Sequence, residues 1–131
     1  MAANRVLIVD DALIMRQRIG NIARESGWEV VGEASDGEEA VNMYQQFQPD
    51  LVTLDIVMPN MDGVAALRRI MQQDSKARVV MVSAINQKEK LMECIDAGAL
   101  DFIVKPFDKA GLRRFLDKYH RPDPTTKETQ H

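Results

Sequence analysis

Five short apolar segments alternate along the chain with five stretches of helical periodicity, and this alternation constrains the fold more than any other feature. The first segment, residues 5–10, is an unbroken apolar run before its terminal acid, as expected for a strand covered on both faces. The intervening stretches carry apolar residues three and four positions apart, which indicates helices. Short connections between such units predict an α/β fold with a five-stranded, doubly wound parallel sheet and right-handed crossovers. This periodicity leaves the strand order open.

Local signals place the elements. A capping box of Asp36 and Glu39 begins the second helix, and the fourth helix is expected to carry Leu91, Met92 and Ile95 on its apolar face. A final helix is expected over residues 108–119. The expected strands cover residues 5–10, 28–34, 50–55, 78–83 and 100–104.

The bulk composition narrows the class of protein. A chain of 131 residues forms one domain, which we expect to cover residues 1–120, and the polar segment 121–131 is expected to be a disordered tail. A net charge of −3 argues against nucleic-acid binding as the main task. No apolar run approaches the ~18 residues of a membrane span, and no signal peptide precedes the first strand. We therefore expect a cytoplasmic domain, and the lone Cys94 excludes an internal disulfide.

Polar residues follow four of the five strands where each strand ends. Asp10 and Asp11 follow the first strand and Asp55 closes the third, while Ser83 and Lys105 end the fourth and fifth. If the strands are parallel, these groups gather at the carboxyl edge of the sheet, where open α/β sheets bind ligands. Any one of them alone would more simply be a turn residue, a helix cap or a solvated charge. Five groups at matching strand ends favour a functional site.

The chemistry of these side chains suits a hard divalent cation and a phosphoryl group. Mg²⁺ takes about six oxygen ligands, typically one or two carboxylates with waters and a phosphate. Asp11 and Asp55 are the candidate direct ligands, and Asp10 would hold a metal-bound water. Lys105 offers a compensating ammonium that could hold a phosphoryl oxygen, and Ser83 could donate a hydrogen bond to another. Without a metal, two carboxylates ~4 Å apart repel by roughly 4 kcal/mol at an effective dielectric near 20.

At these residues the chain resembles the receiver domain of two-component response regulators. The likeness covers about residues 4–119, and within the family the stand-alone chemotaxis regulators look closest. The stretches that carry it are Val6–Asp11, Asp55–Pro59, Asp62-Gly63, Ser83-Ala84, Ala97–Ala99 and Asp101–Pro106. The narrower likeness to the chemotaxis regulators rests on residues 11–16, 51–56 and 102–107.

The resemblance implies a mechanism and a topology. Asp55 would accept a phosphoryl group from a phosphohistidine of a sensor kinase. Mg²⁺ or Mn²⁺ would be ligated by Asp11, Asp55 and the backbone carbonyl of Val57, with Asp10 in support. The resemblance also implies the strand order 2-1-3-4-5 of flavodoxin-like folds and a cis peptide bond before Pro106.

A switch is expected to follow phosphorylation. Ser83 would move toward the phosphoryl group, and Phe102 would fill the space it leaves; a buried strand aromatic is the competing interpretation of Phe102. The expected partners are a histidine kinase and an output protein such as a flagellar motor switch protein or a phosphatase. The protein is expected to be a monomer that could dimerise on phosphorylation. Val57 and Ile85 are apolar where many chemotaxis regulators carry polar side chains, which predicts altered, most simply slower, autodephosphorylation.

Two other functions compete with this interpretation. The chain could be the receiver part of a larger regulator with a separate output domain. It could also be a small phosphatase of the haloacid-dehalogenase kind, which uses an aspartyl nucleophile and Mg²⁺. Such enzymes carry a second Asp two residues after the nucleophile, and here that position is Val57, which counts against an enzyme that turns over.

Overall fold

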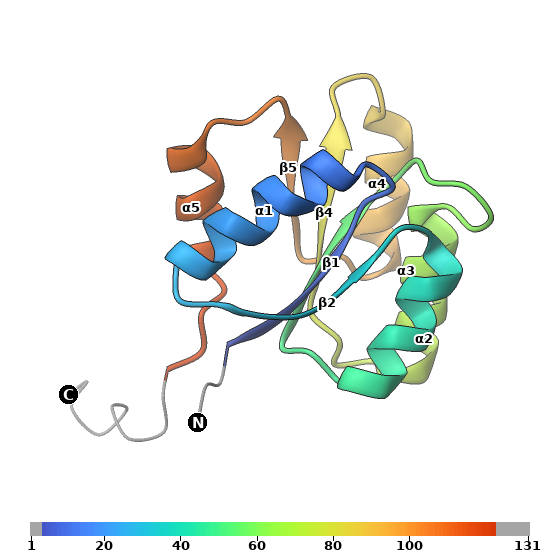
Figure 1. The fold of residues 1–131 in the computed structure, drawn as a ribbon. Coiled ribbons are helices and arrows are strands. Elements are labelled where there is room, and N and C mark those ends of the chain that lie inside the picture. The colour runs from blue at the N-terminus through green and yellow to red at the C-terminus, as the bar shows by residue number, and fades with distance from the viewer. Residues whose placement is uncertain (1–3, 123–131) are drawn as a thin grey trace.

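The computed structural model describes residues 4–122, in which strands and helices alternate along the chain (Figure 1). The strands are β1 (Arg5–Val9), β2 (Glu29–Ala34), β3 (Leu51–Asp55), β4 (Val79–Ala84) and β5 (Asp101–Lys105). The helices are α1 (Leu13–Glu25), α2 (Gly37–Phe47), α3 (Gly63–Gln73), α4 (Lys88–Ala97) and α5 (Lys109–Asp117).

All neighbouring strands pair in parallel, in the order β2-β1-β3-β4-β5. The predicted five-stranded doubly wound sheet is confirmed, and so is the strand order that the resemblance implied. Figure 1 shows α1 and α5 on one side of the sheet and α2, α3 and α4 on the other. The peptide bond between Lys105 and Pro106 is cis, also as the resemblance implied.

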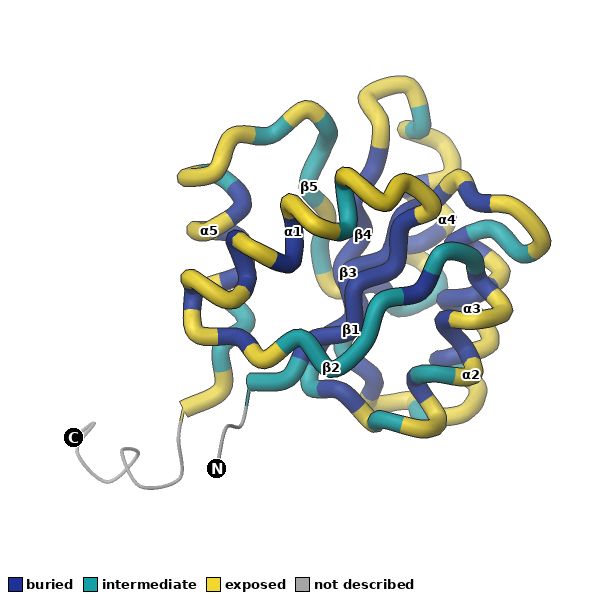
Figure 2. Tube along the Cα trace, viewed as in Figure 1, coloured by how far each residue is buried: buried dark blue, intermediate teal, exposed yellow. Residues whose placement is uncertain are grey.

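The core is divided by the sheet into two apolar clusters, because side chains alternate between the faces of each strand. Leu7 and Leu54 point to the cluster under α2, α3 and α4. Ile8 and Val82 point to the other cluster, under α1 and α5. The central strands β1 and β3 are buried along nearly their whole length, as Figure 2 shows. Burial on both faces explains why these strands appear in the sequence as unbroken apolar runs.

Aspartates cap three of the helices, so the loops at their amino-terminal ends are well defined. Asp36 accepts a hydrogen bond from the Glu39 amide at 2.8 Å. Asp62 and Asp108 cap α3 and α5 in the same way. The predicted capping box differs in one detail, because the Glu39 carboxylate accepts the Ser35 amide at 2.7 Å. The reciprocal bond is thus formed one residue before the cap.

The expected apolar face of α4 is partly wrong. Leu91 and Cys94 are buried, whereas Met92 and Ile95 are exposed. Successive residues of a helix are rotated by about 100°, so Leu91 and Cys94 share the buried face and Met92 is turned away from it. Ile95 follows Cys94 at the edge of this face and is 37% exposed. The helix therefore presents apolar side chains to solvent.

The expected boundary between the domain and the tail, at residue 121, stays a prediction, and Arg121 at this boundary contacts the body of the domain. The Asn4 side-chain amide donates a hydrogen bond to the Arg121 backbone carbonyl at 3.2 Å, and its oxygen accepts one from the Arg121 backbone amide at 2.7 Å. The Arg121 guanidinium also lies 3.5 Å from the Asp50 carboxylate. Residues 123–131 of the predicted tail lie outside the described residues. Within the described part of the chain, no helix is long and apolar enough to cross a membrane.

Candidate functional site

The register of the sheet brings the polar strand ends to one edge. Val9 of β1 pairs with Leu54 of β3, so the residues that follow, Asp10 and Asp55, lie side by side. Across the other half of the sheet, Ala84 pairs with Lys105. The predicted gathering at the carboxyl edge is therefore observed.

Three carboxylates form a compact cluster at this edge. One oxygen from each of Asp10, Asp11 and Asp55 lies within 4.8 Å of the others. Asp10 and Asp55 are only 1% and 7% exposed, whereas Asp11 is exposed to solvent. Asp10 and Asp55 are thus buried, and Asp11 remains accessible to a ligand from solvent.

Lys105 is the cation that compensates this cluster. Its ammonium donates a hydrogen bond to the Asp10 carboxylate at 2.9 Å and lies 3.6 Å from an oxygen of Asp55. Burial opposes its charge, but the hydrogen bond to Asp10 and the nearby Asp55 carboxylate together raise the pKa of Lys105. Lys105 is therefore a fixed positive charge beside both buried acids.

The environment of Asp55 disfavours its negative charge. Burial is the largest cause, and repulsion from Asp10 adds to it, so that the pKa of Asp55 rises to about 6 despite the attraction of Lys105. Carboxylates that are buried together in this way are a common sign of a functional site. A further positive charge at the cluster would relieve the repulsion.

Asp10 is held by more partners than the sequence suggested. Its second carboxylate oxygen accepts the Ala12 amide at 2.9 Å, and its backbone carbonyl accepts a hydrogen bond from the Arg16 guanidinium at 2.7 Å. Arg16 in turn forms an ion pair with Glu33 on β2. Sequence reasoning missed Arg16 because its partners are set by the packing of α1 against the sheet. Both carboxylate oxygens of Asp10 are engaged, so the role of support suits it better than that of a direct ligand.

A close backbone approach at Gly63 holds the loop after β3. The Gly63 amide donates to the Ile56 carbonyl at 2.7 Å. A Cβ at this position would lie only 2.8 Å from the Ile56 Cα and would also meet the Asp55 carbonyl oxygen. Only glycine allows the first turn of α3 to pack this tightly against the residue that bears the central carboxylate.

The other predicted residues surround this cluster in different environments. Ser83 is buried, and its hydroxyl donates to the Ala84 carbonyl at 2.9 Å. Val57 and Ile85 are 54% and 81% exposed. Phe102 is 42% exposed, which contradicts the interpretation of a buried strand aromatic. The direction of the Val57 carbonyl toward a metal stays a prediction.

With this fold and site in view, comparison with known proteins assigns the class. Residues 6–117 match the response regulator receiver domain family, and the chain belongs to that family. It is closely related to the chemotaxis protein CheY. The CheY of Bacillus subtilis (strain 168) is 53% identical over 116 residues, which span 88% of this chain and 97% of that protein. The CheY of Thermotoga maritima is 47% identical over 114 residues, 87% of this chain and 95% of that protein.

A solved structure shows the same architecture. A chain in the crystal structure of the CheX–CheY–BeF3–Mg²⁺ complex from Borrelia burgdorferi superposes with a TM-score of 0.83 at 40% identity. The match covers 90% of each chain. The chain described above is therefore a two-component response regulator receiver of the CheY-like kind.

The donor set fits the divalent metal that the resemblance implied. Three carboxylates within 4.8 Å supply hard oxygen ligands, and burial and then repulsion from Asp10 raise the pKa of Asp55. Of the three acids in this cluster, Asp10 accepts a hydrogen bond from the Lys105 side chain. Within residues 4–122, Asp11 and Asp55 accept none from a side-chain donor. They are the residues that would hold Mg²⁺ or Mn²⁺.

Proposed function

We propose that the protein is a phosphorylation-switched signalling module in which Asp55 accepts a phosphoryl group from a phosphohistidine of a sensor kinase. The single observation that carries this proposal is the cluster of Asp10, Asp11 and Asp55 within 4.8 Å, with the Lys105 ammonium 2.9 and 3.6 Å from two of them. A carboxylate oxygen of Asp55 attacks the phosphorus atom of the donor. The bond from phosphorus to the imidazole nitrogen breaks, the imidazole takes up a proton, and an acyl phosphate remains on Asp55.

The residues around Asp55 supply position and charge for this transfer. Bound Mg²⁺ would offset negative charge on the phosphoryl oxygens, and Asp11, Asp55 and the Val57 carbonyl would hold it. Lys105 stabilises charge on the group being transferred, because its ammonium already lies beside Asp55. Positioning of this kind provides most of the catalysis in phosphoryl transfer.

Replacing Asp55 with Asn tests the proposed acceptor. We expect the wild type to be labelled by acetyl phosphate in the presence of Mg²⁺ and the Asp55→Asn variant to show no label, because an amide cannot form the acyl phosphate. Intact-protein mass spectrometry or Phos-tag electrophoresis would measure the modification. An Asp11→Asn variant that is labelled only at higher Mg²⁺ concentration would separate metal binding from the chemical step. Labelling of the Asp55→Asn variant to the same extent as the wild type would contradict the assignment of Asp55 as the phosphoryl acceptor.

The proposed readout is the surface beside the site. Phosphorylation adds roughly −1.5 to −2 charges near Ser83 and Lys105, and we expect Ser83 to turn toward them and Phe102 to move inward. Phe102 borders an apolar groove of about 280 Å³ on the surface of α4 and β5. The groove is lined by Ala84, Ile85, Lys88, Leu91, Met92, Phe102 and Val104. An inward movement of Phe102 would change its shape and hence the affinity for an output partner.

The close relation to CheY supports a role in chemotaxis or flagellar motor control. On this proposal the output partner is a flagellar motor switch protein or a phosphatase, and the module works in the cytoplasm as a monomer, with dimerisation on phosphorylation as an alternative. In the matched crystal structure from Borrelia burgdorferi, a CheY is in complex with CheX. Binding of the phosphorylated and unmodified protein to the motor switch and phosphatase proteins of the same organism would test this.

A role as the receiver of a larger regulator is the second candidate. The match to the transcriptional regulatory protein PdtaR of Mycobacterium tuberculosis, 40% identical, covers only 52% of that protein. Receivers of this kind thus also occur in longer regulators. A haloacid-dehalogenase-like phosphatase is less well supported, because the Val57 side chain has no group that could transfer a proton. Steady hydrolysis of a generic phosphomonoester would favour the enzyme over the switch.

A further inference from the structure

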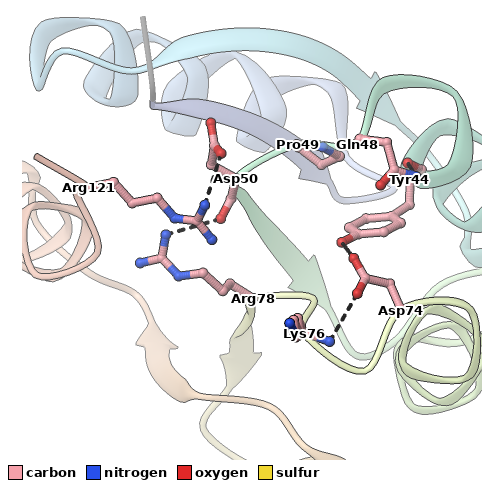
Figure 3. A pocket seen from close by; sticks show the side chains of 8 residues that line it. All are labelled: Tyr44, Gln48, Pro49, Asp50, Asp74, Lys76, Arg78 and Arg121. Carbon is pink, nitrogen blue, oxygen red and sulfur yellow. Dashed lines mark hydrogen bonds and ion pairs between the residues drawn. The ribbon is translucent and has the colours of Figure 1, made fainter. Parts of the chain in front are cut away.

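A polar hollow lies at the amino-terminal edge of the sheet, opposite the acidic cluster (Figure 3). It has a volume of about 300 Å³ and is formed where the chain enters β3 and β4, together with the ends of α2 and α3 and the segment after α5. Its lining residues are Tyr44, Gln48, Pro49, Asp50, Asp74, Lys76, Arg78 and Arg121. None of them belongs to the phosphorylation site.

Arg78 is a half-buried cation in this hollow that has no carboxylate partner. Its guanidinium donates to the backbone carbonyls of Asp50 at 3.3 Å and Tyr119 at 2.6 Å. Among residues 4–122, no carboxylate lies within 4.0 Å of it. Carbonyl groups satisfy two of the five N–H donors of a guanidinium. The Asp50 carboxylate and the Tyr119 ring, 5.9 Å away, offset part of the Arg78 charge, but neither forms an ion pair with it.

Arg121 brings a second guanidinium to the same wall, as Figure 3 shows. It lies 3.5 Å from the Asp50 carboxylate. Burial and then repulsion from Arg121 lower the pKa of Arg78. Two guanidinium groups that repel each other at one wall are stabilised by an anion that both can contact.

The two carboxylates of the hollow already have partners, and for Asp50 one of them is the Arg121 guanidinium. Asp50 accepts the Arg5 backbone amide at 2.9 Å. Asp74 accepts the Tyr44 hydroxyl of α2 at 2.7 Å on one carboxylate oxygen and the Lys76 backbone amide at 3.0 Å on the other. These bonds fix the carboxylates in place.

The balance of charge in the hollow is positive. The lining holds three cations, Lys76, Arg78 and Arg121, and two carboxylates, which leaves a net charge of +1. The Lys76 ammonium forms no ion pair within the described residues. This surplus of positive charge favours an anionic ligand in the hollow.

We propose that this hollow binds a phosphate group, as free phosphate or as a phosphomonoester, with Arg78 and Arg121 as the principal contacts and Lys76 at the rim. Guanidinium groups present paired N–H donors that match the oxygens of a phosphate, and a lysine adds a mobile point charge. The site would lie across the sheet from Asp55 and would take its ligand independently of the phosphorylation chemistry.

Titration with inorganic phosphate tests the site. Two-dimensional ¹H–¹⁵N NMR of the full chain would be recorded with EDTA present, so that no metal recruits phosphate to Asp55, and against chloride at equal ionic strength. We expect saturable shifts at the amides of Asp50, Lys76, Arg78 and Arg121, with a dissociation constant on the order of millimolar. Shifts that rise linearly, or that chloride reproduces, would overturn the proposal.

Charge-matched variants make the test specific. Arg121→Ala should weaken phosphate binding by about tenfold, the effect of losing one charge-assisted hydrogen bond. Arg69→Ala removes an equal charge from an exposed position of α3 that lies outside the hollow, and it should bind phosphate as the wild type does. Lys76→Ala provides a second variant, because it is exposed and its loss leaves the core intact. Arg121→Ala and Lys76→Ala that both bind like the wild type would refute the assignment.

The same titration distinguishes the two sources of the phosphate group. Glycerol 3-phosphate is the probe for a phosphomonoester, and inorganic phosphate is the probe for the free ion. Saturation by both indicates a site that accepts phosphomonoesters, and saturation by inorganic phosphate alone indicates a site for the free anion. Saturation by neither contradicts the proposal.

Discussion

At the scale of single residues, the burial of Asp55 links the protonation of its carboxyl group to the stability of the fold. Its pKa of about 6 lies above the usual value of 3.8, chiefly because of burial and then because of repulsion from Asp10. The native state therefore binds a proton more tightly than the unfolded state does. The stabilising contribution is complete below about pH 4 and is lost as the pH rises through 6. At neutral pH, where the Asp55 carboxyl is mostly ionised, this contribution is largely absent.

We expect the Asp55→Asn variant to be more stable than the wild type at pH 8 in EDTA, by about 1 to 3 kcal/mol. The difference should shrink at pH 4.5, where the wild-type carboxyl is mostly protonated. Urea unfolding followed by circular dichroism at the two pH values measures it. Mg²⁺ should raise the stability of the wild type more than that of the variant, because the variant lacks one ligand. An equal difference at both pH values would contradict this account of Asp55.

Val57 is the residue whose substitution should alter the lifetime of the phosphorylated state. Its side chain is half exposed after Asp55 and cannot hydrogen-bond a water molecule. We expect Val57→Asn to speed autodephosphorylation by roughly two- to tenfold, because a polar side chain there could orient the attacking water. The decay of the phosphorylated protein after removal of acetyl phosphate gives the rate. Val57→Leu, which keeps the position apolar, should decay as the wild type does, and an unchanged rate in Val57→Asn would refute the idea.

At the scale of elements, the packing of α3 against the end of β3 positions the acceptor. Gly63 allows this contact, since an added Cβ would meet backbone atoms of Asp55 and Ile56. Backbone atoms cannot move aside as the end of a flexible side chain can. The first turn of α3 and the loop that carries Val57 would therefore have to shift together.

We expect Gly63→Ala to destabilise the protein by about 1 to 3 kcal/mol and to slow phosphorylation by acetyl phosphate. Gly20→Ala in α1 is a matched control. A Cβ at Gly20 meets only side-chain atoms, at 3.4 Å or more, and alanine favours the helix by up to about 1 kcal/mol. Thermal unfolding of both variants checks the pair. Equal stabilities of the two variants would show that the close approach at Gly63 is unimportant.

At the scale of the whole molecule, the proposed switch links the site to an exposed apolar surface. Phe102, Ile85 and Met92 are all exposed in the structure, and the apolar groove lies among them. Each ~1.4 kcal/mol by which the phosphoryl group favours the inward state of Phe102 would shift its population tenfold. A modest energetic preference at Asp55 would thus be enough to change a docking surface.

We expect the exposure of Phe102 to decrease on phosphorylation. The chain has four phenylalanines, so 4-fluorophenylalanine labelling would give few fluorine resonances, and a Phe102→Leu variant would assign the relevant one. That resonance should shift and lose its solvent isotope effect when acetyl phosphate and Mg²⁺ are added. Ser83→Ala should weaken the response, because the variant lacks the hydroxyl that is proposed to follow the phosphoryl group. An unchanged Phe102 resonance in the phosphorylated wild type would exclude this switch.

Much of the fold and the site could be predicted from local patterns, and the failures have identifiable causes. The caps at Asp36 and Asp62 depend on a few neighbouring residues, so they are visible in the sequence. Met92 and Ile95 were misplaced because apolar character alone does not tell which side of a short helix meets the sheet. The support of Asp10 by Arg16 was missed because that contact depends on where α1 packs.

The sequence by itself determined the alternation of strands and helices and the placement of acids, a hydroxyl and a lysine at strand ends. These properties follow from burial and periodicity within a few residues. Only the tertiary structure decided that three carboxylates lie within 4.8 Å, that Lys105 contacts Asp10 and Asp55, and that the pKa of Asp55 is raised. Distances across strands and the desolvation of a charge depend on register and packing between segments far apart in the chain. No local pattern encodes these distances or this desolvation. The types of side chain at the site could therefore be predicted from the sequence, but the distances between them and the raised pKa of Asp55 could not.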